Sequence, residues 1–181
     1  PEVGPDPHVL HADELDQVVD VVDVALQRGG GEAVDIGEEG RVGARGLAPL
    51  ERIALAAQKG CDGIDPDHVD GYANETGFPL TPDDQLTYNI FLANAAHQNG
   101  LGIGLKNDLA QIPLLVSYFD WMLSEECFTY NECHLLEPFV QAGKPVFVIE
   151  YQLPAENFCA QSTTLNFNAI QKNTELDAFH I

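Results

Sequence analysis

Apolar segments of strand length alternate with helical segments from about residue 52 onward. Such alternation is typical of βα units that build a parallel sheet. The pattern predicts a helix after each of the first four strands and, in chain order, strands over 61–67, 101–107, 118–125, 145–151 and 167–172. We therefore expect an α/β fold with about five βα units.

The helix that follows the first predicted strand carries signals at both of its ends. Thr81 is suited to the N-cap, Pro82 to the first helical position and Gly100 to the stop. Apolar residues at helical spacing predict that one face is buried, formed by Leu86, Ile90, Ala93 and His97. Shorter helices are predicted over 109–117 and over 134–142, the latter ended by Gly143.

Residues 1–50 have a different character, with no aromatic residue and the run Gly29-Gly30-Gly31. The segment from Leu15 to Leu26 fits one amphipathic helix capped by Asp13, and we expect little order beyond it. The chain is therefore divided into an atypical segment, 1–50, and a catalytic-type domain, 51–181.

Each of the first four predicted strands ends in polar or ionisable residues. In a parallel barrel the carboxyl ends of the strands meet at the face where chemistry takes place. Asp65 and Asp67 are two residues apart on an extended strand, so both are expected to point inward with Gly63. Asp62 and Asp70 fit loop and turn positions instead. The strand-end residues are Asp67, Lys106, Asn107, Glu125, Glu150 and Tyr151.

These residues are compatible with more than one chemistry. An Asp and a Glu on opposite sides of a sugar ring are the basic equipment of glycoside hydrolysis. The carboxylates Asp65, Asp67, Glu125 and Glu150 also suit a hard cation. Lys106 either tunes the carboxylates by its charge or forms a structural salt bridge. Aromatic rings suited to sugar stacking or to core packing are Tyr72, Trp121 and Tyr151.

The chain is strongly acidic, with 8 Lys and Arg against 29 Asp and Glu and a formal net charge of -21. This charge repels nucleic acids and anionic membranes and favours a cationic partner, although a soluble acidic surface has the same composition. There is no apolar run of transmembrane length. The chain begins with Pro instead of an initiating Met, so we expect a fragment or a processed chain.

Four cysteines are present, and none forms the C-x2-C pairs of zinc or redox sites. Cys127 and Cys133 enclose a five-residue loop that a disulfide can close in an oxidising compartment. Free thiols are the alternative.

Six motifs in order along the chain resemble glycoside hydrolase family 114, the endo-α-1,4-polygalactosaminidases. They cover the chain from about Arg52 to its end, and they are CDGIDPDHVDGY (61–72), NETGFPLT (74–81), DQLTYN (84–89), GLKND (104–108), SEEC (124–127) and AGKPVFVIEY (142–151). The resemblance implies a (β/α)8 barrel, of which this chain contains about the C-terminal five βα units. A complete barrel needs about 250 residues, more than the 181 present.

The resemblance also implies a function, namely cleavage of internal α-1,4-galactosaminide bonds in a cationic polysaccharide, with retention and without a metal or cofactor. Asp67 would be the nucleophile and Glu125 the general acid and then base. An extracellular location follows from the family and from the possible disulfide. The residues expected to form the sugar-binding shell are Asp65, Asp70, Tyr72, Asn74, Lys106, Asp108, Glu150 and Tyr151.

The chain departs from the family pattern at His68, Ser124 and Glu126, beside the two expected catalytic carboxylates. Residues 1–50 do not resemble the first three strands of the family, so we expect them to reflect a reading-frame change, a gene-model error or a truncation. The alternative to an active enzyme is an incomplete barrel that at most binds cationic glycans.

Overall fold

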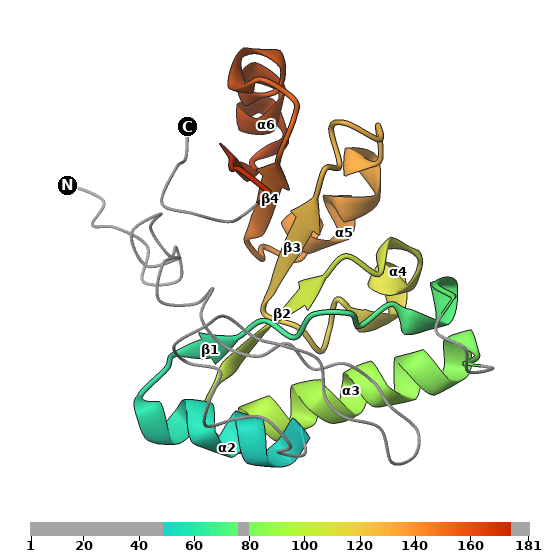
Figure 1. Ribbon diagram of the computed structural model, residues 1–181, viewed down its shortest axis with the longest axis vertical. Coiled ribbons are helices and arrows are strands. Elements are labelled where there is room, and N and C mark those ends of the chain that lie inside the picture. The colour runs from blue at the N-terminus through green and yellow to red at the C-terminus, as the bar shows by residue number, and fades with distance from the viewer. Residues whose placement is uncertain (1–48, 76–79, 175–181) are drawn as a thin grey trace.

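The protein contains a five-stranded parallel sheet with strand order β1-β2-β3-β4-β5 (Figure 1). The computed structural model describes residues 49–75 and 80–174, so the helix expected between Leu15 and Leu26 lies outside the described residues. Every neighbouring pair of strands is parallel, which confirms the α/β class and the five βα units. The strands are β1 (Gly63–Ile64), β2 (Gly102–Lys106), β3 (Trp121–Glu125), β4 (Val146–Glu150) and β5 (Asn168–Gln171).

Helices precede β1 and connect the successive strands. The main apolar core lies between these helices and the outward side chains of the sheet, including Ile103, Leu105 and Val148. None of the helices in the described part of the chain is long and apolar enough to cross a membrane. The helices are α2 (Pro49–Lys59), η1 (Gly71–Ala73), α3 (Pro82–Gln98), η2 (Leu109–Gln111), α4 (Ile112–Leu115), η3 (Cys133–Leu136), α5 (Glu137–Gln141), η4 (Ala155–Asn157) and α6 (Cys159–Leu165).

Helix α3 confirms its predicted ends and, except at His97, its predicted buried face. The Thr81 hydroxyl accepts from the Asp84 N–H and the Asp84 carboxylate accepts from the Thr81 N–H, which is a capping box. Ala93 is buried and Leu86 and Ile90 pack against the core as predicted. The prediction was wrong at His97, and it missed two amides on this helix, Gln85 and Asn89, that find buried hydrogen-bond partners. The buried residues are Gln85, Asn89, Leu92, Ala93, Ala95 and Ala96, and His97 is exposed.

All five strands are shorter than predicted, and two of them, β1 and β3, by three residues or more. β1 covers only Gly63–Ile64, and Pro66 has no N–H to donate to a sheet. β3 begins at Trp121, three residues later than predicted, because the N–H groups of Tyr118 and Phe119 bond to Leu115 as the end of a helical turn. β3 still ends at Glu125 as predicted, whereas β1 ends at Ile64, so Asp65 and Asp67 lie in the loop after β1 and not on the strand as predicted.

The inner face of the sheet, opposite the main core, is lined by glycines beneath one large ring. The Trp121 indole lies across Gly63, Gly102 and Gly104, where a β-carbon would overlap the ring. Trp121 is only 6% exposed and packs beside Phe147. Of its two expected roles, the structure therefore supports interior packing, and the ring fills the inner face below the strand ends.

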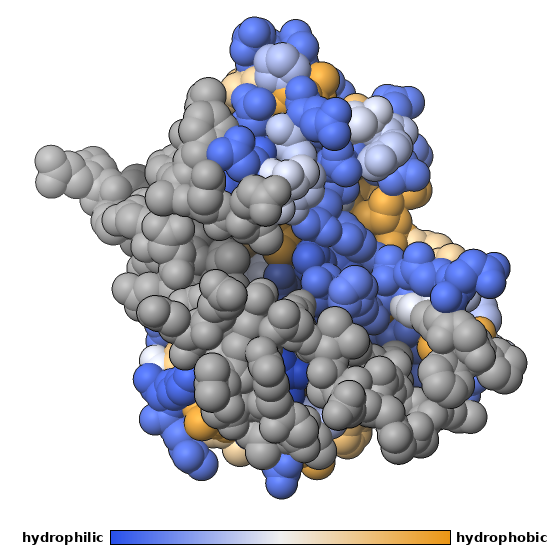
Figure 2. Space-filling model, in the orientation of Figure 1, coloured by the Kyte–Doolittle hydropathy of each residue, from blue (hydrophilic) through white to orange (hydrophobic). Residues whose placement is uncertain are grey.

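Hydrophilic residues dominate the described surface in the view of Figure 2. A smaller hydrophobic area lies between α4 and α5, to the right in the same view. The hydrophilic character agrees with the large acidic excess of the chain.

Candidate active site

Three of the predicted residues meet at the carboxyl ends of the first three strands. The Lys106 ammonium lies 2.9 Å from Asp67 Oδ1 and 3.5 Å from Glu125 Oε2. Because these two contacts share one nitrogen atom, the two carboxylate oxygens are at most about 6.4 Å apart. All three side chains are partly buried, so one ammonium holds two carboxylates at a solvent-accessible site.

Glu125 is fixed by two further neighbours. The Tyr151 hydroxyl donates a hydrogen bond to Glu125 Oε1, and Asn107 Nδ2 donates to Oε2 at 3.2 Å. The Asn107 amide oxygen also accepts from the Glu125 backbone N–H at 3.0 Å. Asn107 was predicted as a strand-end residue but not as part of the sugar-binding shell. Its position next to Lys106 in the sequence could have indicated that it belongs to the site.

The opposite charges at this site stabilise the ionised forms of Asp67 and Lys106. Burial opposes ionisation of Asp67, but the hydrogen bond and charge of Lys106, with the His68 N–H, hold the pKa of Asp67 below its ordinary value. Burial also opposes the charge on Lys106, but Glu125, Asp67 and Asp65 raise the pKa of the ammonium. Asp67 is therefore a carboxylate, and Lys106 a cation, at neutral pH.

Asp65 lies beside this group in a different state. Burial raises the pKa of Asp65 to about 7, since the opposing charge of Lys106 is offset in part by Asp67 and Glu125. Its Oδ1 is buried without a hydrogen-bond partner in the described structure. Two aspartates that are two residues apart thus have pKa values shifted in opposite directions.

A second polar cluster lies between η1, η2 and α3. Asp108 accepts hydrogen bonds from the Tyr72 hydroxyl at 3.2 Å and from Asn89 Nδ2 at 3.0 Å. Asp70 accepts from Asn74 Nδ2 at 3.3 Å. Burial, with the charge of Asp70, raises the pKa of Asp108 to about 7. Four predicted shell residues therefore belong to this cluster rather than to the group around Lys106.

Asn89 was not among the predicted site residues. Its amide donates to Val69 O and to Asp108, and its oxygen accepts from Gln85 Nε2. The available signal was an Asn at the end of the DQLTYN motif, four residues after a Gln, within a helix that must bury one face.

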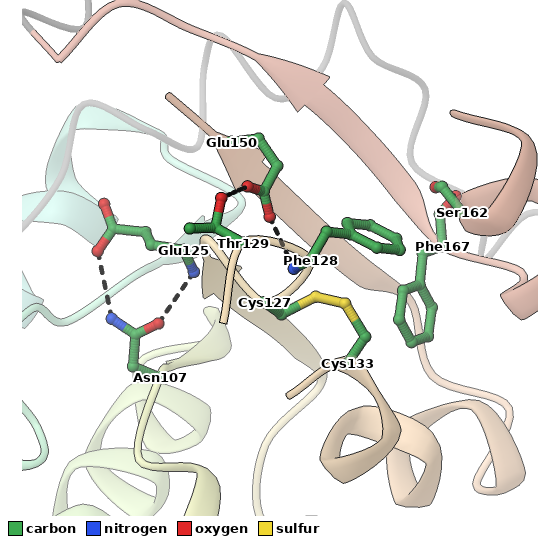
Figure 3. Close-up of a disulfide and its surroundings, with 9 residues drawn as sticks. All are labelled: Asn107, Glu125, Cys127, Phe128, Thr129, Cys133, Glu150, Ser162 and Phe167. Atoms are coloured by element: carbon green, nitrogen blue, oxygen red, sulfur yellow. Dashed lines mark hydrogen bonds between the residues drawn. A yellow bond between two sulfur atoms is a disulfide. The ribbon is translucent and has the colours of Figure 1, made fainter. Parts of the chain in front are cut away.

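Glu150 is placed away from the sugar-binding shell for which it was predicted. It is fully buried, and its carboxylate accepts from the Phe128 N–H at 2.9 Å and from the Thr129 hydroxyl at 2.7 Å (Figure 3). The same loop is closed by a disulfide between Cys127 and Cys133, so those two residues are not free thiols. Glu150 and the disulfide together fix the loop that follows Glu125.

The loops after the first three strands contain strained backbone. Positive φ angles occur at His68, Asn107, Asp108 and Glu126, which are 54°, 54°, 47° and 59°. Such conformations are uncommon for residues other than glycine and gather at functional sites. His68 and Glu126 are two of the departures from the family pattern, and each is adjacent to an expected catalytic carboxylate.

The hard-cation alternative has no support from the described residues. Among them, no group of three or more His, Cys, Asp or Glu side chains is arranged to hold a metal ion. Glu150 faces its loop, and Asp67 and Glu125 contact Lys106.

Comparison with known proteins gives consistent matches. The model of Glycoside-hydrolase family GH114 matches residues 29–181, starting upstream of Arg52. The crystal structure of Aspergillus fumigatus Ega3 in complex with galactosamine is 40% identical in sequence with a TM-score of 0.68. That similarity covers 73% of this chain and 58% of the Ega3 chain. This chain therefore spans little more than half of that relative.

The glycoside hydrolase domain of PelA from Pseudomonas aeruginosa is also similar, with 16% identity and a TM-score of 0.52. The similarity covers 73% of this chain and 61% of that chain, and at this identity it supports the fold alone. No curated protein gives a significant match.

Proposed function

The chain belongs to glycoside hydrolase family GH114, and from this premise we propose that it hydrolyses internal α-1,4-galactosaminide bonds in a galactosamine-containing polysaccharide. One observation carries the proposal: the Lys106 ammonium joins Asp67 and Glu125 at the carboxyl ends of parallel strands. An Asp and a Glu in this position are the two groups that glycoside hydrolysis requires.

The two carboxyl groups suit different roles. Asp67 is held ionised, so it attacks the anomeric carbon while Glu125, in its protonated form, gives its proton to the leaving oxygen. This step forms a glycosyl ester on Asp67 and releases one half of the polymer. Glu125 then removes a proton from water, which attacks the same carbon and restores free Asp67. Tyr151 and Asn107 orient Glu125 through both steps.

The contacts of Lys106 are compatible with retention of configuration. They set a ceiling of about 6.4 Å on the distance between Asp67 Oδ1 and Glu125 Oε2, which includes the short separation that retention needs. Inverting enzymes hold their carboxyl groups roughly 6.5–9.5 Å apart to leave room for a water molecule. Retaining enzymes hold their carboxyl groups at roughly 5–5.5 Å.

The charge of the chain supports a cationic substrate. A net charge of -21 raises the local concentration of a polycation and repels polyanions. The galactosamine bound by Ega3, the 40% identical relative, agrees with this class of sugar. Secretion, supported by the disulfide, would bring the chain to such a polysaccharide outside the cell.

One observation favours the second candidate, an incomplete barrel that only binds cationic glycans. Within residues 49–75 and 80–174 the sheet has five strands, and β1 and β5 each pair on one side only. A barrel of this type needs eight strands to close.

Incubation with deacetylated galactosamine polymer decides between the two candidates. The wild-type chain should release oligosaccharides, and Asp67→Asn and Glu125→Gln should each lower the rate by about 10²-fold or more. Glu156→Gln, an exposed acid on η4, serves as the control for the loss of one charge. Binding of the polymer without release of shorter chains would favour the incomplete barrel, and undiminished cleavage by both variants would reject the catalytic assignment.

A further inference from the structure

Asp65 has an environment that a sugar-binding role does not explain. Its Oδ1 lies in the interior, against Gly104, where a β-carbon would come within 2.6 Å of this oxygen. The Trp121 indole lies against the same glycine. The oxygen is buried and has no hydrogen-bond partner among the described residues. Asp65 as a whole is half-buried, but a negative charge on this oxygen is unfavourable because no donor stabilises it there.

The charges around Asp65 are unbalanced. Lys106 on β2 is the cation that acts on it, while Asp67 from the loop after β1 and Glu125 on β3 repel it. Tyr151, after β4, is engaged with Glu125. Since Lys106 already contacts Asp67 and Glu125, a third carboxylate would compete for the same ammonium.

We propose that Asp65 is a positioning residue that keeps its proton in the working enzyme, so that Lys106 stays shared between Asp67 and Glu125. This inference rests on the proposed function, since it concerns the same two carboxyl groups. Ionisation of Asp65 draws Lys106 inward and weakens its hold on the catalytic pair. The site then loses activity through the charge of a residue that need not touch the substrate.

The pKa of about 7 supports the geometry and fixes the pH window. The folded state binds this proton more tightly than the unfolded state, where the pKa of Asp65 has its ordinary value of 3.8. The stabilisation is therefore complete below pH 3.8, falls as pH rises and is lost above about 7. Asp108 has a similar window, so a comparison of variants must isolate Asp65.

The decisive experiment compares the full wild-type chain with Asp65→Asn, a variant of similar shape that cannot ionise. The ratio of the variant's kcat/KM to that of the wild-type chain should be constant below pH 6 and rise by about tenfold per pH unit above 7. Titration of the substrate amines affects both proteins and largely cancels in the ratio. Glu156→Gln should give a ratio that does not change with pH. A pH-independent ratio for Asp65→Asn would overturn the inference.

A second measurement needs neither activity nor the variant. The side-chain carboxyl carbon of Asp65, assigned by through-bond NMR correlation in the wild-type chain, should titrate with a midpoint near pH 7. A midpoint near pH 4 overturns the inference even if the chain is an active hydrolase. A midpoint near 7 in a chain that cleaves no galactosamine polymer would uphold the proton on Asp65 and reject the proposed function, so the two failures are distinguishable.

Discussion

The glutamates that end β3 and β4 show how one residue type serves opposite purposes on the two faces of a sheet. Glu125 points to the inner face, where Lys106, Tyr151 and Asn107 hold it at a partly exposed site. Glu150 points to the outer face, is fully buried, and accepts hydrogen bonds from the loop after β3. Figure 3 shows the two carboxylates on separate sets of partners.

The register of the sheet causes this difference. Glu125 is aligned with Ile149, so Glu150 is one residue further along its strand. Successive side chains on a strand point to opposite faces of the sheet. A shift of one residue therefore moves a side chain from the inner face to the outer face. Glu125 is accessible to a substrate, whereas Glu150 holds the loop that follows Glu125 through its hydrogen bonds with Phe128 and Thr129.

The largest difference in kcat is expected between the two variants in which one of these glutamates is replaced by glutamine. Glu125→Gln removes the proposed proton donor and should lower kcat by about 10²–10⁴-fold with little loss of stability. Glu150→Gln keeps an amide oxygen that accepts from the Phe128 N–H, so kcat should stay close to that of the wild-type chain. Steady-state rates on galactosamine polymer, with urea unfolding of both variants, test the contrast. Equal losses of kcat in the two variants would contradict the assignment of catalysis to the inner face and of loop support to the outer face.

A second pair of variants tests the two faces at consecutive residues of β2. Leu105 is fully buried in the main core, and Leu105→Ala should destabilise the chain by about 2–5 kcal/mol but leave kcat intact in the folded protein. Gly104→Ala should cost about 1–3 kcal/mol and also lower kcat, because the new β-carbon displaces Trp121 and Asp65.

Urea unfolding gives the stabilities of both variants, and kcat is measured at a temperature at which both remain folded. If Leu105→Ala lost as much kcat as Gly104→Ala, the inner face would have no special relation to the site.

The sequence pattern was sufficient for the parts of the site that depend on local order. The alternation of strands and helices predicted that Asp67, Lys106 and Glu125 end neighbouring parallel strands. Lys106 and Glu125 do so, Asp67 lies in the loop three residues after β1, and the structure brings all three together. The short loop between Cys127 and Cys133 likewise suggested the disulfide that is present. In both cases the prediction depends only on residues that are close together in the sequence.

The remaining features depend on register and on distant partners. The side of the sheet that Glu150 faces follows from its strand being offset against β3, which no local pattern reveals. The glycines beneath Trp121 come from two strands, and their common role is visible only once β1, β2 and β3 are aligned. The polar buried face of α3 exists because Asn89 meets Asp108 from another part of the chain.

The smallest effect is expected from removing one hydroxyl on the outer side. Thr129→Val keeps the shape of the side chain but takes one hydrogen bond from the buried Glu150 carboxylate, so the chain should lose about 1–2 kcal/mol. This loss of stability is at the lower end of the roughly 1–3 kcal/mol that an unsatisfied buried group costs, because Thr129 is exposed and water can replace its hydroxyl. Thr163→Val is the matched control, since that exposed threonine on α6 donates only to the backbone oxygen of Cys159. Urea unfolding should show a loss of stability for Thr129→Val that the control does not show, and kcat should be unchanged in both variants. A large loss of kcat in Thr129→Val would instead mean that the loop after β3 takes part directly in the chemistry of Glu125.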